Sequence, residues 1–201
     1  MNESRTLDVS GLPPGAFGSR TVTFWGTLGM VLIESTVFAL AITSYFYYLA
    51  RFPSWPPDGI APPLLRWGTV NTVILLGSLI PNELARRAAE RVDLQGVRIW
   101  MVVCLAFAVG FNWVRVYEFR HLNVWWDHDA YGSIVWILLG LHTTHIVTDF
   151  LDSAVLTTLM FIGPVEEHRF VDVEENSVYW YFVVLAWLPI YGVIYWAPRL
   201  T

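Results

Sequence analysis

The chain has 201 residues, of which 55% are hydrophobic, 16% aromatic and 14% charged, and its formal net charge is −5. Soluble domains carry about 25% charged residues, so this composition excludes an ordinary water-soluble domain and indicates an integral membrane protein. The acidic balance, with no basic block, argues against nucleic acid as a partner. The single cysteine, Cys104, excludes an internal disulfide and a cysteine-based metal cluster.

The first residues are polar and do not show the basic and apolar pattern of a cleaved signal peptide. We expect residues 1–22 to form a polar tail ahead of one membrane domain, residues 23–198. Five apolar stretches in that domain are long enough to cross a bilayer, which takes about 20 residues. The sequence therefore predicts an all-α fold, a polytopic membrane bundle of five transmembrane helices. The stretches are 24–49, 67–85, 97–117, 131–162 and 178–196.

The connections between these stretches differ in character. Residues 50–63 hold too many prolines for a helix. Residues 164–177 are acidic, and we expect a solvated connector there, although the same charges could attract a basic partner. Seven arginines lie on the N-terminal side of the membrane and five on the other side, and 86–98 is the densest group. Cytoplasmic loops carry an excess of arginine and lysine, so we predict a cytoplasmic N-terminus and a C-terminus outside.

Glu34 lies about ten residues into the first apolar stretch. A charged group at membrane depth is costly, so such residues face a bundle interior, a cavity or a partner. Two interpretations stay open. Glu34 is either a group that handles protons or contacts lipid, or a neutral strut that joins helices by hydrogen bonds.

The fourth stretch carries four ionisable residues, His142, His145, Asp149 and Asp152. At about 100° per residue they fall within an arc of about 80°, which predicts one wall of an internal polar seam with Glu34 as a neighbour. The two histidines share a face and could hold one small ion, but no histidine on another stretch completes an axial haem pair. The alternatives are hydrogen bonds between helices or contact with a lipid head group. The aspartates either lead protons or are solvated near a helix end.

Two further groups of polar residues lie within the apolar stretches. Asn71, Ser78 and Asn82 recur at helical spacing and form one stripe beside Pro81. Arg115 and Glu118 are three residues apart near the end of the third stretch, so they can pair. We expect no catalytic and no metal-ligating residue in this chain.

Several short motifs follow one another in a consistent order. Glu34 precedes Phe38, and the other segments are Trp55–Ile60, Asn71–Ser78, Phe111–Glu118, Tyr131–Ser133, Gly140–His145 and Tyr179–Val183. Together they resemble subunit III of the haem–copper terminal oxidases, the cytochrome c and quinol oxidases, in its short five-helix form.

The chain departs from the family pattern at four positions. Arg115 stands where the family usually has glutamine, and Thr143 where it often has glycine. Tyr181 replaces a histidine and Val184 an aspartate, so we expect the fifth stretch to lose polar contacts there.

The resemblance implies a non-catalytic protein that packs beside oxidase subunits I and II in a bacterial inner membrane. Haem and copper would belong to subunit I and none to this chain. Phospholipid would lie in a cleft, with Glu34, His142 and His145 in the same region, and the chain would support proton uptake. Two rivals remain. One is an accessory protein of a nitric oxide reductase, and the other is a stand-alone proton-coupled transporter that uses Glu34 and the ionisable face of the fourth stretch.

Overall fold

The computed structural model describes residues 22–57, 59–162, 165 and 167–200, and all regular structure within them is helical. This confirms the all-α prediction. A π-helical turn, Gly192–Trp196, joins the last long helix to a short terminal one. The α-helices are α1 (Val22–Arg51), α2 (Leu65–Glu90), α3 (Leu94–Arg120), α4 (Ala130–Phe161), α5 (Glu167–Tyr191) and α6 (Ala197–Leu200).

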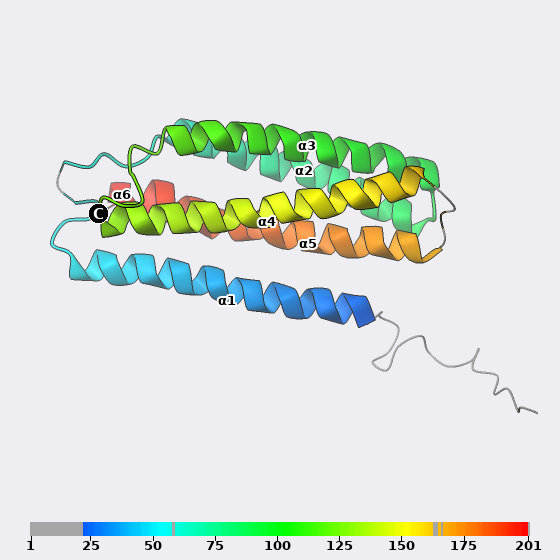
Figure 1. Cartoon of the computed structure of the whole chain (residues 1–201), viewed down its shortest axis with the longest axis horizontal. Coiled ribbons are helices and arrows are strands. Elements are labelled where there is room, and N and C mark those ends of the chain that lie inside the picture. Colours follow the sequence, from blue (N-terminus) through cyan, green and yellow to red (C-terminus); the bar gives the residue numbers. More distant parts are fainter. Residues whose placement is uncertain (1–21, 58, 163–164, 166, 201) are drawn as a thin grey trace, which may run out of the picture.

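The five long helices run side by side along the long axis of the molecule and reverse direction at each end (Figure 1). α1 begins at the end where α2 turns into α3 and where α4 ends. α1 packs against α4 and α5, and α2 packs against α3 and α5. The bundle therefore brings the start of α1, the end of α4 and the start of α5 together.

Among the described residues, four helical segments are long and apolar enough to cross a membrane. They correspond to α1, α3, α4 and the run from His168 to Leu200. α2 is not among them, because its polar stripe and its arginines lower its hydropathy. The structure thus supports an integral membrane protein, and the predicted count of five spans stays a prediction.

The acidic segment before the last span is mostly helix and not the connector that we expected. α5 begins at Glu167, so residues 167–177 extend the last long helix. Phe170 and Val173, three residues apart, pack in an apolar cluster with Ala85, Ala89 and Met160 from α2 and α4. Glu175 and Ser177 are also buried. The prediction of a solvated acidic connector is therefore wrong for this part of the chain.

A second, larger apolar cluster fills the rest of the bundle and includes three residues from the connections between helices, Trp55, Leu122 and Val124. Trp55, in the proline-rich connection between α1 and α2, is buried and lies edge-on to the rings of Tyr45 and Tyr131. Two connections end in aspartates that cap the next helix. Asp93 accepts from the amide of Gly96 at α3, and Asp129 accepts from the amide of Gly132 at α4. These caps fix where α3 and α4 begin.

Candidate functional site

Glu34 lies at the contact of α1 with α4 and α5 and meets one side chain from each of them. The hydroxyl of Tyr179 donates to Glu34 Oε2 at 2.9 Å, and His145 Nε2 lies 3.5 Å from Glu34 Oε1. The Glu34 and His145 side chains are only 20% and 12% exposed. Tyr179 is a partner that the sequence did not point to, because tyrosines near the ends of membrane helices are common as interfacial residues.

The hydrogen bond of His145 Nδ1 determines what its Nε2 atom presents to Glu34. His145 Nδ1 lies 2.7 Å from the carbonyl oxygen of Leu141, and a carbonyl oxygen only accepts, so Nδ1 carries a hydrogen. A neutral imidazole then has only a lone pair at Nε2, which faces the Glu34 oxygen. The contact is favourable when either Glu34 or His145 holds one additional proton.

His142 points elsewhere, although it is only one turn from His145. Its Nδ1 lies 3.2 Å from Arg115 Nη2 and its Nε2 lies 3.1 Å from the carbonyl oxygen of Val183. Arginine only donates and a carbonyl only accepts, so His142 is neutral with its hydrogen on Nε2. Both ring nitrogens are thus engaged and the residue is fully buried. His142 cannot share an ion with His145, and it has no surface to offer a lipid.

Arg115 and Glu118 form an ion pair of 2.8 Å that lies inside the bundle. Their side chains are 2% and 1% exposed. Glu118 also accepts from Asn71 of α2 and from Tyr195 of the π-helical turn. The Arg115 guanidinium lies 4.4 Å from the centre of the Trp187 ring. Buried charges persist when they are paired and hydrogen-bonded, so this network ties α2, α3, α4 and the end of α5 together.

The ionisable arc of α4 is graded in exposure from one edge to the other. Relative to His142, the residues Asp149, His145 and Asp152 are turned by about 20°, 60° and 80°. His142 is 0% exposed and Asp149 is 4% exposed, whereas His145 is partly exposed and Asp152 is exposed. The arc is therefore not one seam. His142 at its inner edge meets α3 and α5, His145 meets α1, and Asp152 at its outer edge accepts from Asn176 of α5.

Glu34 and Asp149 line the same cavity between α1, α4 and α5. The cavity has a volume of about 620 Å³ and also borders Asp152, Asp172 and Arg169. Thr23 and Asp152 are exposed, so the cavity opens at the surface near the start of α1. The structure thus joins two of the sequence-derived site residues, Glu34 and Asp149, through a polar space.

The predicted polar stripe of α2 is buried, and each member has a partner. Besides the bond from Asn71 to Glu118, Trp180 donates to the Ser78 hydroxyl at 2.9 Å, and Asn82 donates to the carbonyl oxygen of Ser177 at 3.2 Å. The helix continues through Pro81. The stripe therefore serves as the contact of α2 with α3 and α5.

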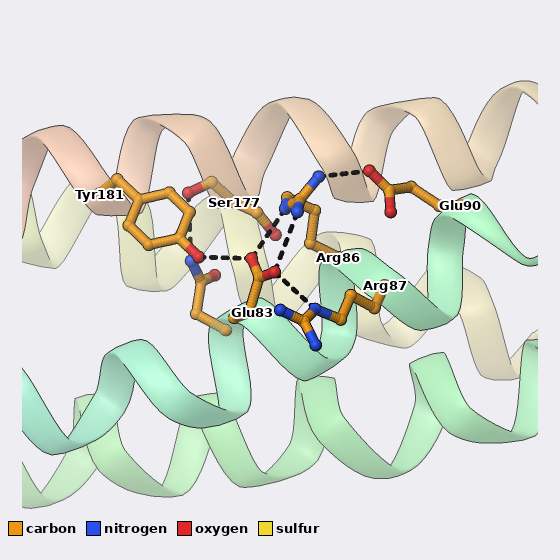
Figure 2. Close-up of polar contacts among 7 residues, drawn as sticks. Glu83, Arg86, Arg87, Glu90, Ser177 and Tyr181 are labelled. Atoms are coloured by element: carbon orange, nitrogen blue, oxygen red, sulfur yellow. Dashed lines mark hydrogen bonds and ion pairs between the residues drawn. The ribbon is translucent and has the colours of Figure 1, made fainter.

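Tyr181 does not remove a polar contact from α5, contrary to our expectation. Its hydroxyl donates to Glu83 at 2.7 Å, and Glu83 also accepts from Arg86 and Arg87 (Figure 2). Arg86 pairs in turn with Glu90. This charged cluster lies at the end of α2 near the turn to α3. The sequence missed it because the local spacing of the charges does not indicate that a tyrosine about 100 residues later completes the set.

The remaining departures from the expected pattern have simple structural roles. Val184 is fully buried in the larger apolar cluster. The Thr143 hydroxyl donates to the carbonyl oxygen of Leu139 within α4 at 2.6 Å. Within the part of the chain that the structure describes, no group of three or more His, Cys, Asp or Glu residues is arranged to hold a metal ion.

Comparison with known proteins gives a consistent result. The family model "Cytochrome c oxidase subunit III" matches residues 19–198. Cytochrome c oxidase subunit 3 of Synechocystis sp. is 26% identical over 182 residues, which cover 90% of this chain and 78% of the relative. The protein of the same name from Thermostichus vulcanus is 24% identical over 175 residues, 87% of each chain. That of Emericella nidulans is 29% identical over 182 residues, 84% of this chain and 66% of the relative.

Proposed function

The chain belongs to the cytochrome c oxidase subunit III family, and we propose that it is the non-catalytic subunit III of a respiratory haem–copper oxidase in a bacterial inner membrane. In that complex it packs beside subunits I and II, which carry the haem and copper. Its own contribution is to stabilise subunit I, to hold phospholipid and to support proton uptake. The observation that carries the proton role is the Glu34–His145 contact, a proton-sharing pair beside a polar cavity.

Phospholipid has a suitable place next to this pair. An apolar groove of about 520 Å³ lies between α1 and α5, lined by residues such as Leu28, Phe38, Phe182 and Leu185. An acyl chain fits such a surface because burial of apolar area is favourable. Glu34 precedes Ser35 of the groove lining on α1 and contacts His145 of α4, so these two are the polar groups that a head group would meet. His142 is not part of this lipid site, because it is fully buried.

All five long helices cross the membrane in the arrangement that we propose. α2 lies in the bundle between α3 and α5, and its polar residues Asn71, Ser78 and Asn82 are buried rather than turned to lipid. The arginine cluster 86–98 then faces the cytoplasm, with the N-terminus, and the C-terminus lies outside. We expect single cysteines at Ala61 and Asp93, two exposed positions that flank α2, to react with an impermeant maleimide from the outer and the cytoplasmic side respectively, in a Cys104→Ser background. Reaction of both from one side would contradict the five-span arrangement.

Purification of the native complex tests the oxidase role. We expect haem and copper to co-purify with this chain and with a larger polytopic subunit. A colourless particle that is complete without a partner and transports protons would overturn the proposal in favour of the transporter. The relatives described above are all named cytochrome c oxidase subunit 3, so the nitric oxide reductase role gains no support from them.

Glu34→Gln is expected to leave assembly intact and to slow proton uptake severalfold or shorten the turnover life of the oxidase. Glutamine keeps an oxygen that can accept from Tyr179, but it cannot share a proton with His145. The measurement is steady-state oxygen consumption and proton uptake by the purified complex, followed until the enzyme inactivates.

Glu90→Gln is the matched control for this substitution, because Glu90 is an exposed carboxylate that pairs with Arg86 and lies away from the cavity. We expect it to behave as the parent enzyme. Equal turnover and equal inactivation rates for Glu34→Gln, Glu90→Gln and the parent would contradict the role of Glu34.

A further inference from the structure

Asp149 is a buried carboxyl group, and no ion pair or hydrogen bond among the described residues satisfies its Oδ1 atom. It is 4% exposed, and its Oδ1 atom is closed off from solvent and has no hydrogen-bond partner among the described residues. None of the ion pairs within the described part of the chain includes Asp149. Burial of a polar atom without a partner costs free energy. We therefore expect Asp149 to bind a ligand that is not part of the helices.

Asp149 forms part of the wall between two cavities. The outer cavity is the space of about 620 Å³ between α1, α4 and α5, which Glu34 and Asp152 also line. The inner cavity has a volume of about 20 Å³ and lies among α2, α3, α4 and α5. Asp149 and Asn176 border both of them. The carboxyl group is therefore positioned between a space that opens at the surface and a much smaller one that lies among four helices.

The inner cavity has the size and the lining of a site for one water molecule. A buried water needs a cavity of at least about 10–15 Å³ and two to four polar partners. Besides Asp149, the lining includes Asn82, Ser153 and Asn176, whose oxygen atoms can accept hydrogen bonds. A water held there would donate to Asp149 Oδ1 and so satisfy the atom that the helices leave without a partner.

The charges around the outer cavity favour the binding of a cation. Its lining includes the acidic residues Glu34, Asp149, Asp152, Asp172 and Glu175 and a single basic residue, Arg169. Metal ions are a poor fit, because no group of three or more His, Cys, Asp or Glu residues in the described ranges is arranged to hold one. A proton carried by water needs no such coordination.

We propose that Asp149 is a proton-exchange site, which exchanges its proton with water in the outer cavity while a single water in the inner cavity donates a hydrogen bond to it. The acid gives its proton to water in the outer cavity, and a hydronium ion in the same cavity returns a proton to the carboxylate oxygen. One O–H bond breaks as another forms in each step, and no redox partner is required. At rest the carboxyl group is in its neutral acid form, because a buried carboxylate without a cation is costly.

The test is infrared difference spectroscopy of the purified oxidase in H₂O and in D₂O. We expect a C=O band of a protonated carboxyl group that shifts on transfer to D₂O, is lost in Asp149→Asn, and is retained in Asp152→Asn and Glu34→Gln. Asp152 is the matched control, since it is an aspartate on the same helix and the same cavity but is exposed. A spectrum of Asp149→Asn that keeps every exchangeable carboxyl band would overturn the proposal.

A second measurement does not depend on the folding of the Asp149→Asn variant. In the unmodified complex, a small carbodiimide should label Asp149, because carbodiimides react with protonated carboxyl groups, and peptide mass spectrometry locates the adduct. Labelling of Glu34 with none at Asp149 would overturn the assignment. The proposal concerns the proton of Asp149 and does not rest on the role of Glu34. Unchanged turnover in Glu34→Gln would contradict only the role of Glu34, and an unchanged carboxyl band in Asp149→Asn would contradict only the role of Asp149.

Discussion

Arg115→Met is expected to lower the free energy of unfolding by about 3–5 kcal/mol, because it leaves a buried carboxylate without its cation. Glu118 is 2% exposed and is held by Arg115, Asn71 and Tyr195 from three different elements. The substitution also removes the donor to His142 Nδ1 and the cation that lies over the ring of Trp187. The measurement is thermal inactivation and loss of this subunit from the purified complex on heating.

The double variant Arg115→Met/Glu118→Gln separates the charge effect from the packing effect. Glutamine at position 118 is neutral, and its oxygen can still accept from Asn71 or Tyr195. Removal of both charges avoids the uncompensated ion, so most of the lost stability should return. Equal destabilisation in the single and the double variant would mean that the unpaired charge is not the cause.

The sequence predicted the helices well where a single local property determines them. Long apolar stretches predicted the four helical segments of the described chain that are long and apolar enough to cross a membrane, and the prolines of 50–63 predicted the break between α1 and α2. The prediction was wrong for residues 167–177. There the helix packs into the bundle through two apolar residues, Phe170 and Val173, and acidic residues outnumber them. The π-helical turn at 192–196 had no local signal either, although it places Tyr195 against Glu118.

The site could be predicted only as far as helical geometry extends. Helical spacing predicted the direction in which each ionisable residue of α4 points. It did not predict which residue of another helix each one contacts. Over that arc the covering groups come from three elements, so His142 meets Arg115 of α3 and His145 meets Glu34 of α1. Spacing along one helix does not show which distant segments pack together. It therefore could not predict that Tyr179 donates to Glu34, or that Asp149 Oδ1 is buried without a hydrogen-bond partner.

Gly68→Ala is expected to destabilise the fold by about 1–3 kcal/mol through overpacking. A Cβ atom at Gly68 would lie 2.5 Å from two carbon atoms of the Tyr195 ring. The ring has little freedom to retreat, because its hydroxyl is hydrogen-bonded to Glu118. Displacement of Tyr195 would also cost the buried carboxylate one of its donors. The same thermal inactivation assay measures the loss.

Two comparisons show whether the Tyr195 ring is the cause of this loss. Alanine is the better helix former, by about 1 kcal/mol over glycine, so Gly110→Ala on α3, where a Cβ meets no atom within 4 Å, should not destabilise the chain. In a Tyr195→Ala background the ring is absent, and Gly68→Ala should then be neutral or slightly stabilising. This change of sign requires direct contact between positions 68 and 195, since sites without shared partners contribute additively. An equal loss in both backgrounds would contradict the packing of the π-helical turn against α2 and, with it, the route by which Tyr195 reaches Glu118.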